Sequence, residues 1–267
     1  MLEAINRGLR CEVAQNTMTI RWIFFDCFNT LVDDFDWEGD PSGLGPMRHL
    51  PVKWGVYASD EAFCQDYLQW RQQQWQQQWD EILLSERLMG VLQWQAPARS
   101  HSELAALIAE MVQCFEQTYP RALRLPPGVQ EMLAHWQGRV RMGVISNFHL
   151  PGWPIRALTQ FGLQDAFEFV LDSATCGKRK PGPEIYRQAL ALAQVSEQDM
   201  GQVLFVGDHL HNDVLMPQKL GMQSVYFDRS QVRLGVAPAP PAQVWAIDHW
   251  QEFRLEAVQA QGLSVAL

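Results

Sequence analysis

An apolar run that ends abruptly in an acidic residue constrains the fold of this chain more than any other stretch. Residues 22–25 (WIFF) are continuously apolar, as in a strand that is buried on both faces. The next residue, Asp26, cannot stay ionised in a dry core without a partner. The pattern predicts a central parallel strand that presents Asp26 at its carboxyl end, where open α/β sheets bind ligands. Taken alone, the stretch fits equally well an Asp that only caps the following loop.

The second half of the chain alternates between apolar strands and amphipathic helices. Its predicted strands cover residues 140–146, 167–171, 203–206, 224–227 and 244–246. Helices are predicted between them, among them residues 129–137, 154–161, 183–194 and 212–220, with a closing helix at 249–260. Such alternation indicates a three-layer α/β fold, in which a parallel sheet is covered by helices on both faces. We assign residues 18–33 and 127–267 to this core.

Residues 34–126 interrupt the alternation with a helical insertion. After a loop rich in Asp, Gly and Pro, apolar residues recur at three- and four-residue spacing from Ser59 onward. A second apolar stripe begins at Ser102 and ends near Pro120. Residues 1–17 are polar and weakly patterned, without the apolar segment of a signal peptide, so we expect a poorly ordered extension there.

Composition excludes several classes of partner. The chain has 30 acidic and 21 basic residues, and a net charge of −9 disfavours binding to nucleic acid. No apolar run is long enough to cross a bilayer, so we expect no membrane partner. Five scattered cysteines without a C-x-x-C pair favour a reducing, cytoplasmic location over a disulfide framework or zinc site. The oligomeric state is not readable from these patterns.

Polar residues gather after the strands at four places along the chain. They are Asp26 with Thr30, Ser146 with Asn147, Lys180, and Asp208 with Asp213. Parallel strands would bring all four groups to one crevice. Several carboxylates near one point raise each other's pKa unless a cation joins them, and Mg²⁺ prefers such oxygen ligands. The pattern therefore predicts a Mg²⁺ site that also holds a small-molecule substrate.

In this order, the four groups resemble the motifs of the haloacid dehalogenase superfamily of hydrolases. The matching stretches are FDCFNTL (25–31), ISN (145–147), KP (180–181) and GDHLHND (207–213). The resemblance extends over residues 19–227. It implies a Rossmann-like core that carries an inserted α-helical cap domain.

The resemblance also implies a role for each residue. Asp26 would be the covalent nucleophile, Ser146 and Asn147 would hold the transferred group, and Lys180 would balance its charge. Thr30 belongs to the first motif. Asp208 would bind Mg²⁺ directly, and Asp213 would support the metal or Lys180. The backbone carbonyl of Phe28 would be the third protein ligand of the ion, beside Asp26 and Asp208.

The first and fourth motifs point to different reactions. Phosphatases of the superfamily usually carry a second Asp as general acid–base where this chain has Phe28, and its loss typically costs about 10²–10⁴-fold in rate. Asn29 likewise replaces the usual Gly. Dehalogenases of the family also lack that acid, but they generally work without Mg²⁺ and lack the carboxylate that this chain keeps as Asp208.

We weigh the fourth motif more heavily, because a buried carboxylate pair is electrostatically costly without a cation. The leading hypothesis is Mg²⁺-dependent hydrolysis of a small phosphorylated metabolite, with His149, His209 or His211 as candidate surrogate acids. Metal-independent 2-haloacid dehalogenation is the runner-up. Phosphonate cleavage through Lys53 and a non-catalytic remnant that binds metal or phosphate stay open.

Overall fold

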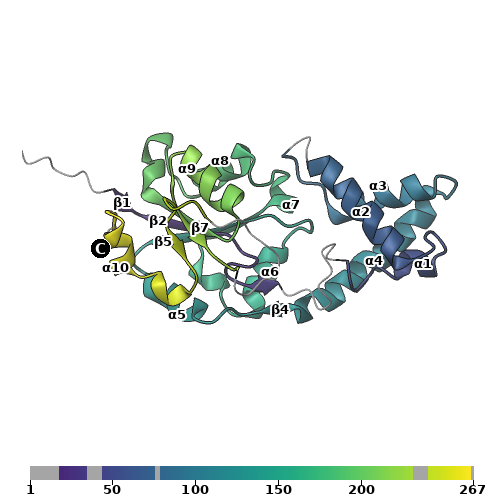
Figure 1. Cartoon of the computed structure of the whole chain (residues 1–267), viewed down its shortest axis with the longest axis horizontal. Coiled ribbons are helices and arrows are strands. Elements are labelled where there is room, and N and C mark those ends of the chain that lie inside the picture. Colours follow the sequence, from purple (N-terminus) through teal and green to yellow (C-terminus); the bar gives the residue numbers. More distant parts are fainter. Residues whose placement is uncertain (1–17, 35–43, 76–78, 231–239, 266–267) are drawn as a thin grey trace, which may run out of the picture.

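A six-stranded parallel sheet forms the centre of the computed structural model, which describes residues 18–34, 44–75, 79–230 and 240–265. The expected extension at 1–17 lies outside these residues. The strands, in spatial order, are β6 (Phe169–Asp172), β5 (Arg141–Ser146), β2 (Trp22–Phe25), β7 (Val203–Gly207), β8 (Gln223–Phe227) and β9 (Ala246–Ile247). The predicted strand 22–25 therefore lies inside the sheet, between β5 and β7 (Figure 1).

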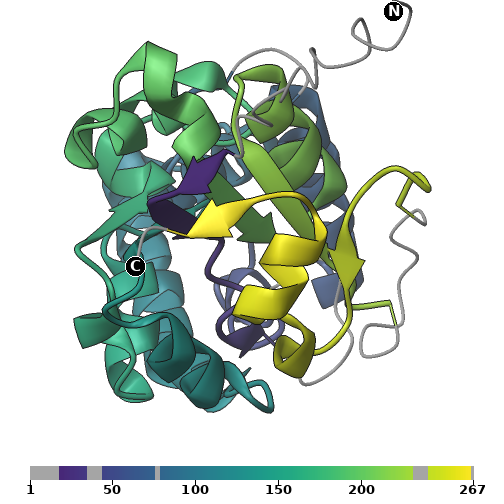
Figure 2. The same cartoon turned by 90° about the vertical axis from the view of Figure 1, so that its left-hand side faces the viewer.

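Helices cover both faces of the sheet because successive side chains of β2 point to opposite sides. Ile23 and Phe25 belong to the core cluster that includes residues of α5 (Val129–Trp136), α6 (Trp153–Gln160) and α10 (Leu255–Ala260). Trp22 and Phe24 belong to a second cluster, with residues of α8 (Pro183–Leu192). Figure 2 shows the two helical layers on either side of the strands. The predicted three-layer α/β fold is confirmed.

Strand register brings the ends of the central strands to one level. Phe25 pairs with Val144 of β5 and with Val206 of β7. The Asp26 N–H continues this ladder by donating to the Val206 carbonyl at 2.9 Å. Residues that follow β2, β5 and β7 therefore emerge together at the carboxyl edge of the sheet.

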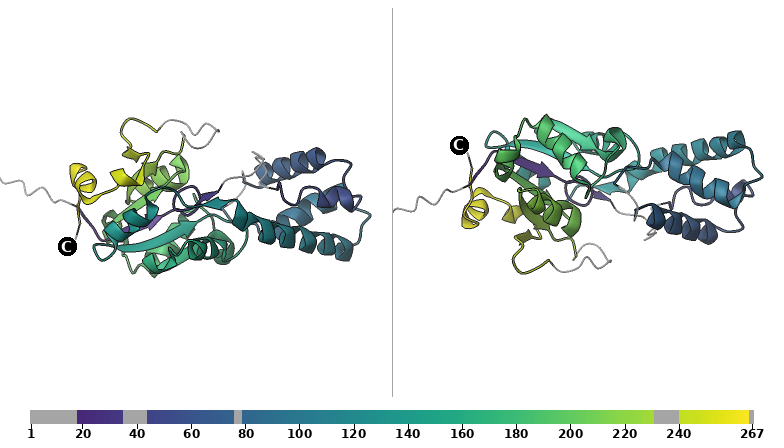
Figure 3. Two further views of the ribbon diagram at one scale, coloured as in Figure 1. Left: turned by 90° about the horizontal axis from the view of Figure 1, so that it is seen from below. Right: turned by 90° about the horizontal axis from the view of Figure 1, so that it is seen from above.

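Among the described residues, the four helices between β3 (Asp33–Asp34) and β4 (Leu123–Arg124) form a group beyond this edge, which we call the helical unit (residues 44–75 and 79–121; Figures 1 and 3). They are α1 (Leu50–Lys53), α2 (Asp60–Trp75), α3 (Leu84–Gln95) and α4 (His101–Thr118), followed by a 3₁₀ turn at Tyr119–Arg121. The chain enters the unit after β3 (Asp33–Asp34) and leaves it through β4 (Leu123–Arg124), and these two strands pair antiparallel.

Some predicted boundaries differ from the structure. The helix predicted from Ser102 begins at His101, because Ser100 caps it: Ser100 Oγ accepts from the Glu103 N–H, and the Glu103 side chain accepts from the Ser100 N–H. The predicted helix 212–220 is a π-helical turn (Leu210–Leu215) that continues into α9 (Met216–Lys219). The closing helix predicted at 249–260 is a 3₁₀ turn (Trp250–Glu252) followed by α10.

Short strands β1 (Thr19–Ile20) and β10 (Ser264–Val265) pair in parallel beside the sheet. A short helix, α7 (Ser173–Cys176), directly follows β6. Among the described residues, every helix is either too short or too polar to cross a bilayer.

Candidate active site

Lys180 links the first acidic residue of the site to the last. Its Nζ donates to Asp26 Oδ1 and to Asp213 Oδ1, both at 2.7 Å. Asp26 extends the central strand β2, while Asp213 lies in the turn after β7. Two carboxylates from different strand ends therefore share one ammonium group.

Burial makes this arrangement strongly electrostatic. The side chains of Lys180 and Asp213 are 2% and 1% exposed. Burial lowers the pKa of Lys180, but the carboxylates of Asp213 and Asp26 outweigh it and raise that pKa above its ordinary value. Burial raises the pKa of Asp213 to about 7, against the lowering effect of Lys180. A lysine held as a cation between two acids is suited to neutralise charge on a bound anion.

The loop after β7 is shaped around Asp213. Its Oδ2 accepts from the backbone N–H of His209 at 2.9 Å. A Cβ on Gly207 would lie only 2.5 Å from Asp213 Cγ, so the last position of β7 must be glycine for the carboxylate to approach. The Tyr186 hydroxyl of α8 donates to the Asn212 carbonyl and braces the same loop. Asp208 stands at the start of this loop.

Three carboxylates meet as a candidate site for a divalent cation. Asp26, Asp208 and Asp213 each offer an oxygen, and these oxygens lie within 4.8 Å of one another. The backbone amides of Thr30, Leu31 and Val32 all donate to the Cys27 carbonyl, and none of these three donates to the Phe28 carbonyl. An all-oxygen donor set of this kind fits Mg²⁺.

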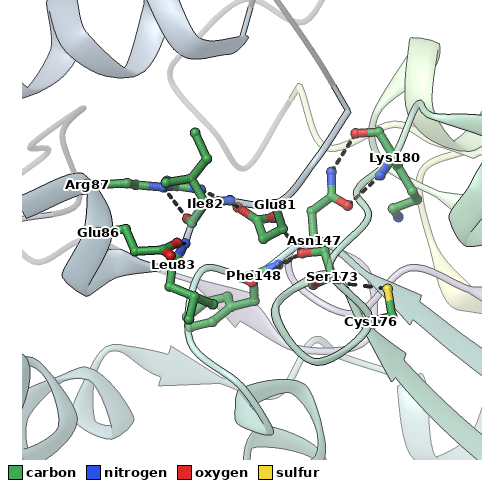
Figure 4. Close-up of polar contacts among 10 residues, drawn as sticks. All are labelled: Glu81, Ile82, Leu83, Glu86, Arg87, Asn147, Phe148, Ser173, Cys176 and Lys180. Carbon is green, nitrogen blue, oxygen red and sulfur yellow. Dashed lines mark hydrogen bonds and ion pairs between the residues drawn. The ribbon is translucent and has the colours of Figure 1, made fainter. Parts of the chain in front are cut away.

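Two hydroxyls of the predicted site have hydrogen-bonding capacity left for a bound oxyanion. Thr30 Oγ1 and Ser146 Oγ are buried and have no hydrogen-bond partner among the described residues. Buried hydroxyls normally find a partner in a folded protein. The Asn147 side chain, by contrast, already has partners. It forms two hydrogen bonds of 2.8 Å, one with the backbone N–H and one with the backbone carbonyl of Lys180 (Figure 4). The loops that carry Ser146 and Lys180 are thereby fixed to each other.

An aromatic cluster occupies the position where the superfamily's general acid would stand. The Phe28 ring is 7% exposed and packs on Phe148 with centroids 4.6 Å apart. Tyr119, at the end of the helical unit, contacts both rings at 6.1 and 5.5 Å. The cluster consists of Phe28, Phe115, Tyr119, Phe148, His149 and Trp153. Phe28 is therefore part of the packing between the sheet edge and the helical unit.

Two of the three histidines considered as surrogate acids, His149 and His209, are poorly suited to donate a proton. Burial lowers the pKa of His149 to about 3, and its ring stacks on Phe148 at 4.7 Å. Burial and Lys180 also lower the pKa of His209, whose Nδ1 accepts from the Asn212 N–H at 3.3 Å. His211 lies exposed on the π-helical turn.

Asn29 is compatible with the first-motif turn. Its φ of 64° lies in the left-handed region, which Asn tolerates better than other side-chain-bearing residues. Its Oδ1 also accepts from the Asp34 N–H at 3.3 Å. Replacing the usual Gly by Asn therefore preserves the turn that follows Asp26.

Sequence reasoning missed Glu81, Arg87 and Ser173. Glu81 and Arg87 form an ion pair with side chains 3% and 7% exposed, and Ser173 Oγ donates to Glu81 at 2.6 Å. Glu81 and Ser173 are 92 positions apart, in no shared pattern. The one available signal was a charged residue directly before the apolar Ile82, Leu83 and Leu84.

Comparison with known proteins agrees with this geometry. A family model described as haloacid dehalogenase-like hydrolase matches residues 20–221, which is most of the chain. The chain belongs to the haloacid dehalogenase-like hydrolase family.

Individual relatives are more distant. A glyceraldehyde 3-phosphate phosphatase of Pyrococcus abyssi is 31% identical over 109 residues, covering 39% of this chain and 43% of the relative. Pyrimidine 5′-nucleotidase YjjG of Escherichia coli is 30% identical over 115 residues, covering 42% of this chain and 49% of the relative. The chain thus spans about half the length of these relatives. The crystal structure of a 2-haloacid dehalogenase from Pseudomonas syringae has a TM-score of 0.65 at 21% identity, covering 91% of this chain and 99% of that one.

Proposed function

We propose that this protein is a Mg²⁺-dependent phosphatase of small phosphorylated metabolites that works through a phosphorylated Asp26. The main support is the retained Asp208, whose carboxylate joins those of Asp26 and Asp213 within 4.8 Å. Three clustered carboxylates repel one another and would repel an anionic substrate, and a divalent cation bound among them relieves both repulsions. The phosphatases among the relatives agree with this choice of substrate class.

The proposed reaction divides into transfer and hydrolysis. An Asp26 oxygen attacks the phosphorus, the bond to the leaving oxygen breaks, and water then cleaves the aspartyl phosphate to regenerate Asp26. Lys180 neutralises charge on the phosphoryl oxygens, while the hydroxyls of Thr30 and Ser146 and the Asn147 backbone amide bind them. Asp26, Asp208, Asp213 and the Phe28 carbonyl would hold Mg²⁺, which when bound supplies further charge neutralisation for the phosphoryl group.

The aromatic cluster limits the substrate. With Phe28 in place of an acid, the leaving oxygen departs without a carboxyl group to protonate it. Acyl or aryl phosphates, whose leaving groups are stable as anions, are therefore favoured over simple alkyl phosphates.

We also propose that the helical unit acts as the cap of this site. In the expected division, residues 34–126 close over a core made of residues 18–33 and 127–267. The paired strands β3 and β4 carry both chain crossings, as expected for a hinge. Cys27, Cys64, Cys114 and Cys176 are free thiols, which supports a reducing, cytoplasmic location.

Metal-independent 2-haloacid dehalogenation is the second candidate, and Phe28 favours it. A halide leaves without a proton, so an apolar residue near the leaving group costs nothing. In this reaction Asp26 would attack the carbon that bears the halogen, releasing halide and forming an ester that water hydrolyses.

One panel of substrates separates the two candidates. Aryl phosphates, acyl phosphates and 2-haloacids would be assayed for phosphate and halide release, with and without Mg²⁺, with Asp26→Asn as the blank. Phosphate release that requires Mg²⁺ and Asp26 is expected. Halide release without metal would select dehalogenation, and no release from any substrate would indicate a binding remnant.

A further inference from the structure

Glu81 is a buried acid that the proposed chemistry does not use. It lies on the segment that leads into α3, and its side chain is 3% exposed. Its Oε1 accepts from Arg87 Nη2 at 2.6 Å and from the Ile82 N–H at 2.9 Å. Arg87 Nε also donates to the Ile82 carbonyl at 2.8 Å, which fixes the guanidinium. A buried charge held by several donors has a defined position, unlike a solvated surface acid.

The second oxygen of Glu81 reaches out of the helical unit to the core. Ser173 Oγ donates to Glu81 Oε2 at 2.6 Å and accepts from the Phe148 N–H at 2.9 Å (Figure 4). Ser173 has one hydroxyl proton, and the Phe148 carbonyl competes for it at 3.1 Å. The shorter bond to an ionised acceptor is the stronger one. Glu81 therefore directs the proton toward itself and turns the Ser173 lone pairs toward the Phe148 N–H.

This chain of bonds ends at the residues that would hold the phosphoryl group. Phe148 directly follows Ser146 and Asn147, and Asn147 exchanges two hydrogen bonds with the backbone of Lys180. Glu81 is thus two hydrogen bonds away from the Ser146–Asn147 loop, and this loop is bonded in turn to Lys180.

The backbone around Glu81 contacts the same two loops. The Glu81 N–H donates to the Gly177 carbonyl at 3.0 Å, and the Arg179 N–H donates to the Trp79 carbonyl at 2.9 Å. On the other loop, the Leu84 N–H donates to the His149 carbonyl at 2.9 Å. Residues 79–84 therefore rest on the loop before Lys180 and on the loop after β5.

We propose that Glu81 is a positioning residue, which couples the seating of the helical unit to the geometry of the Ser146–Asn147 loop. When the unit is seated, Glu81 orients Ser173, and Ser173 holds the Phe148 amide. When the unit moves away, the Ser173 hydroxyl can rotate toward the Phe148 carbonyl, and its lone pairs are no longer fixed on the Phe148 N–H. The Ser146–Asn147 loop therefore has its phosphoryl-binding geometry only when the helical unit is seated on the core. The kinetic part of this inference rests on the proposed phosphatase function.

The first test compares two variants on neighbouring residues, with p-nitrophenyl phosphate and Mg²⁺. Glu81→Gln keeps the size of the side chain and removes its charge; a misplaced catalytic loop should lower kcat about 10- to 100-fold. KM should change by less than about threefold, because ground-state binding is retained. The control, Asp80→Asn, breaks the Asp80–Lys178 ion pair, whose side chains are 45% and 40% exposed. It should change kcat by less than about twofold.

A double variant tests the route. Ser173→Ala removes the hydroxyl that joins Glu81 to the Phe148 amide. It can replace Glu81→Gln as the test variant if Glu81→Gln unfolds the helical unit. Because both residues act through one bond, the double variant should be no slower than the slower single variant. The coupling would be overturned if the losses in kcat of the two single variants multiply in the double variant. It would also be overturned if Glu81→Gln and Asp80→Asn lose the same activity, or if only KM changes.

Amide exchange tests the positioning without turnover. The Phe148 N–H should exchange with deuterium at least about tenfold faster in Glu81→Gln than in the wild-type protein, since its acceptor is no longer fixed. Asp80→Asn should leave this exchange unchanged. Unchanged protection in Glu81→Gln would overturn the inference even if the wild-type protein is an active phosphatase. If the wild-type protein releases no phosphate, the proposed function fails, and the exchange of this amide alone decides the positioning role.

Discussion

The two sides of the candidate site treat polarity in opposite ways. On the acidic side, Lys180 bridges Asp26 and Asp213 through two bonds of 2.7 Å. On the aromatic side, Phe28 and Phe148 pack 4.6 Å apart where the superfamily's phosphatases usually carry an acid. The first side stabilises charge, while the second offers no carboxyl group for a leaving oxygen. The difference teaches that phosphoryl transfer and protonation of the leaving group depend on separate residues, so a chain can keep one and lose the other.

Removing the central cation should break the acidic side most severely. Lys180→Met leaves two carboxylates beside each other without the cation between them, and breaking a buried ion pair costs about 3–5 kcal/mol of unfolding free energy. Urea denaturation measures this loss. Adding Asp213→Asn should recover part of the stability, because one unpaired charge is then removed. A cost below about 1 kcal/mol for Lys180→Met would contradict a buried, charge-balanced centre.

Asp208→Asn should separate the metal from the rest of the acidic side. Without Mg²⁺, the variant should be as stable as the wild-type protein or slightly more stable, because like charges repel. With Mg²⁺, only the wild-type protein should show a marked rise in its thermal midpoint. Phosphatase activity at a fixed Mg²⁺ concentration should fall about 10²–10³-fold.

The matched control for Asp208→Asn is Asp228→Asn, at the end of the neighbouring strand β8 and outside the three-carboxylate cluster. It should respond to Mg²⁺ as the wild-type protein does. If Mg²⁺ stabilises Asp208→Asn as strongly as the wild-type protein, the assigned metal site is wrong.

Phe28→Asp should sharpen the comparison by placing an acid on the aromatic side. Turnover of alkyl phosphates relative to aryl phosphates should rise by at least about tenfold, since the leaving alkoxide can then be protonated. Losing the buried ring should also cost about 3–5 kcal/mol in stability. The control is Phe28→Asn, because Asn has the size of Asp but no acidic proton. It should show the same loss of stability without the change in preference between alkyl and aryl phosphates. An equal change in preference for both variants would rule out proton donation.

A smaller effect, the pH dependence of stability, tests whether water is excluded from the aromatic side. Burial lowers the pKa of His149 to about 3, so below its ordinary pKa of 6.5 the unfolded chain binds a proton that the folded chain does not. Stability should therefore fall as the pH drops from about 6.5 toward 3, with a slope from this group of up to ~1.4 kcal/mol per pH unit. His149→Phe keeps a ring on Phe148 and should remove this part of the slope.

Chemical denaturation at pH 5.0 and 6.5 measures this effect, with His101→Gln as the control because His101 is exposed at the start of α4. Identical pH dependence of the wild-type protein and His149→Phe would mean that water reaches the ring of His149.

The strand ends could be predicted because burial on both faces leaves a continuous apolar run. Residues 22–25 and 203–206 ended where an acid or a Gly-Asp pair began, and the structure places both strands side by side. The path from Asp208 to Asp213 was harder. A predicted α-helix is a π-helical turn there, and Asp213 Oδ2 accepts from the His209 N–H in the same loop. Only the folded loop fixes that geometry.

Contacts across the sheet edge had no pattern to predict them. Glu81 meets Ser173 because two loops 92 positions apart face each other, which no periodicity encodes. Phe28 was recognised as a missing acid, but its packing with Tyr119 depends on where the helical unit ends. The predicted N-cap of α4, Ser102, lies two positions after the observed one, because Ser100 and Ser102 are both plausible caps and the Glu103 side chain selects Ser100.

The pairing of β3 with β4 has a consequence for how such a chain can diversify. Asp33 lies opposite Arg124 and Asp34 opposite Leu123, so the two crossings to the helical unit run side by side. A tight turn could join them without altering the strand order of the sheet. Whole blocks of sequence could therefore be exchanged at this junction during evolution or in the laboratory, giving new substrate preferences while the reacting groups keep their places.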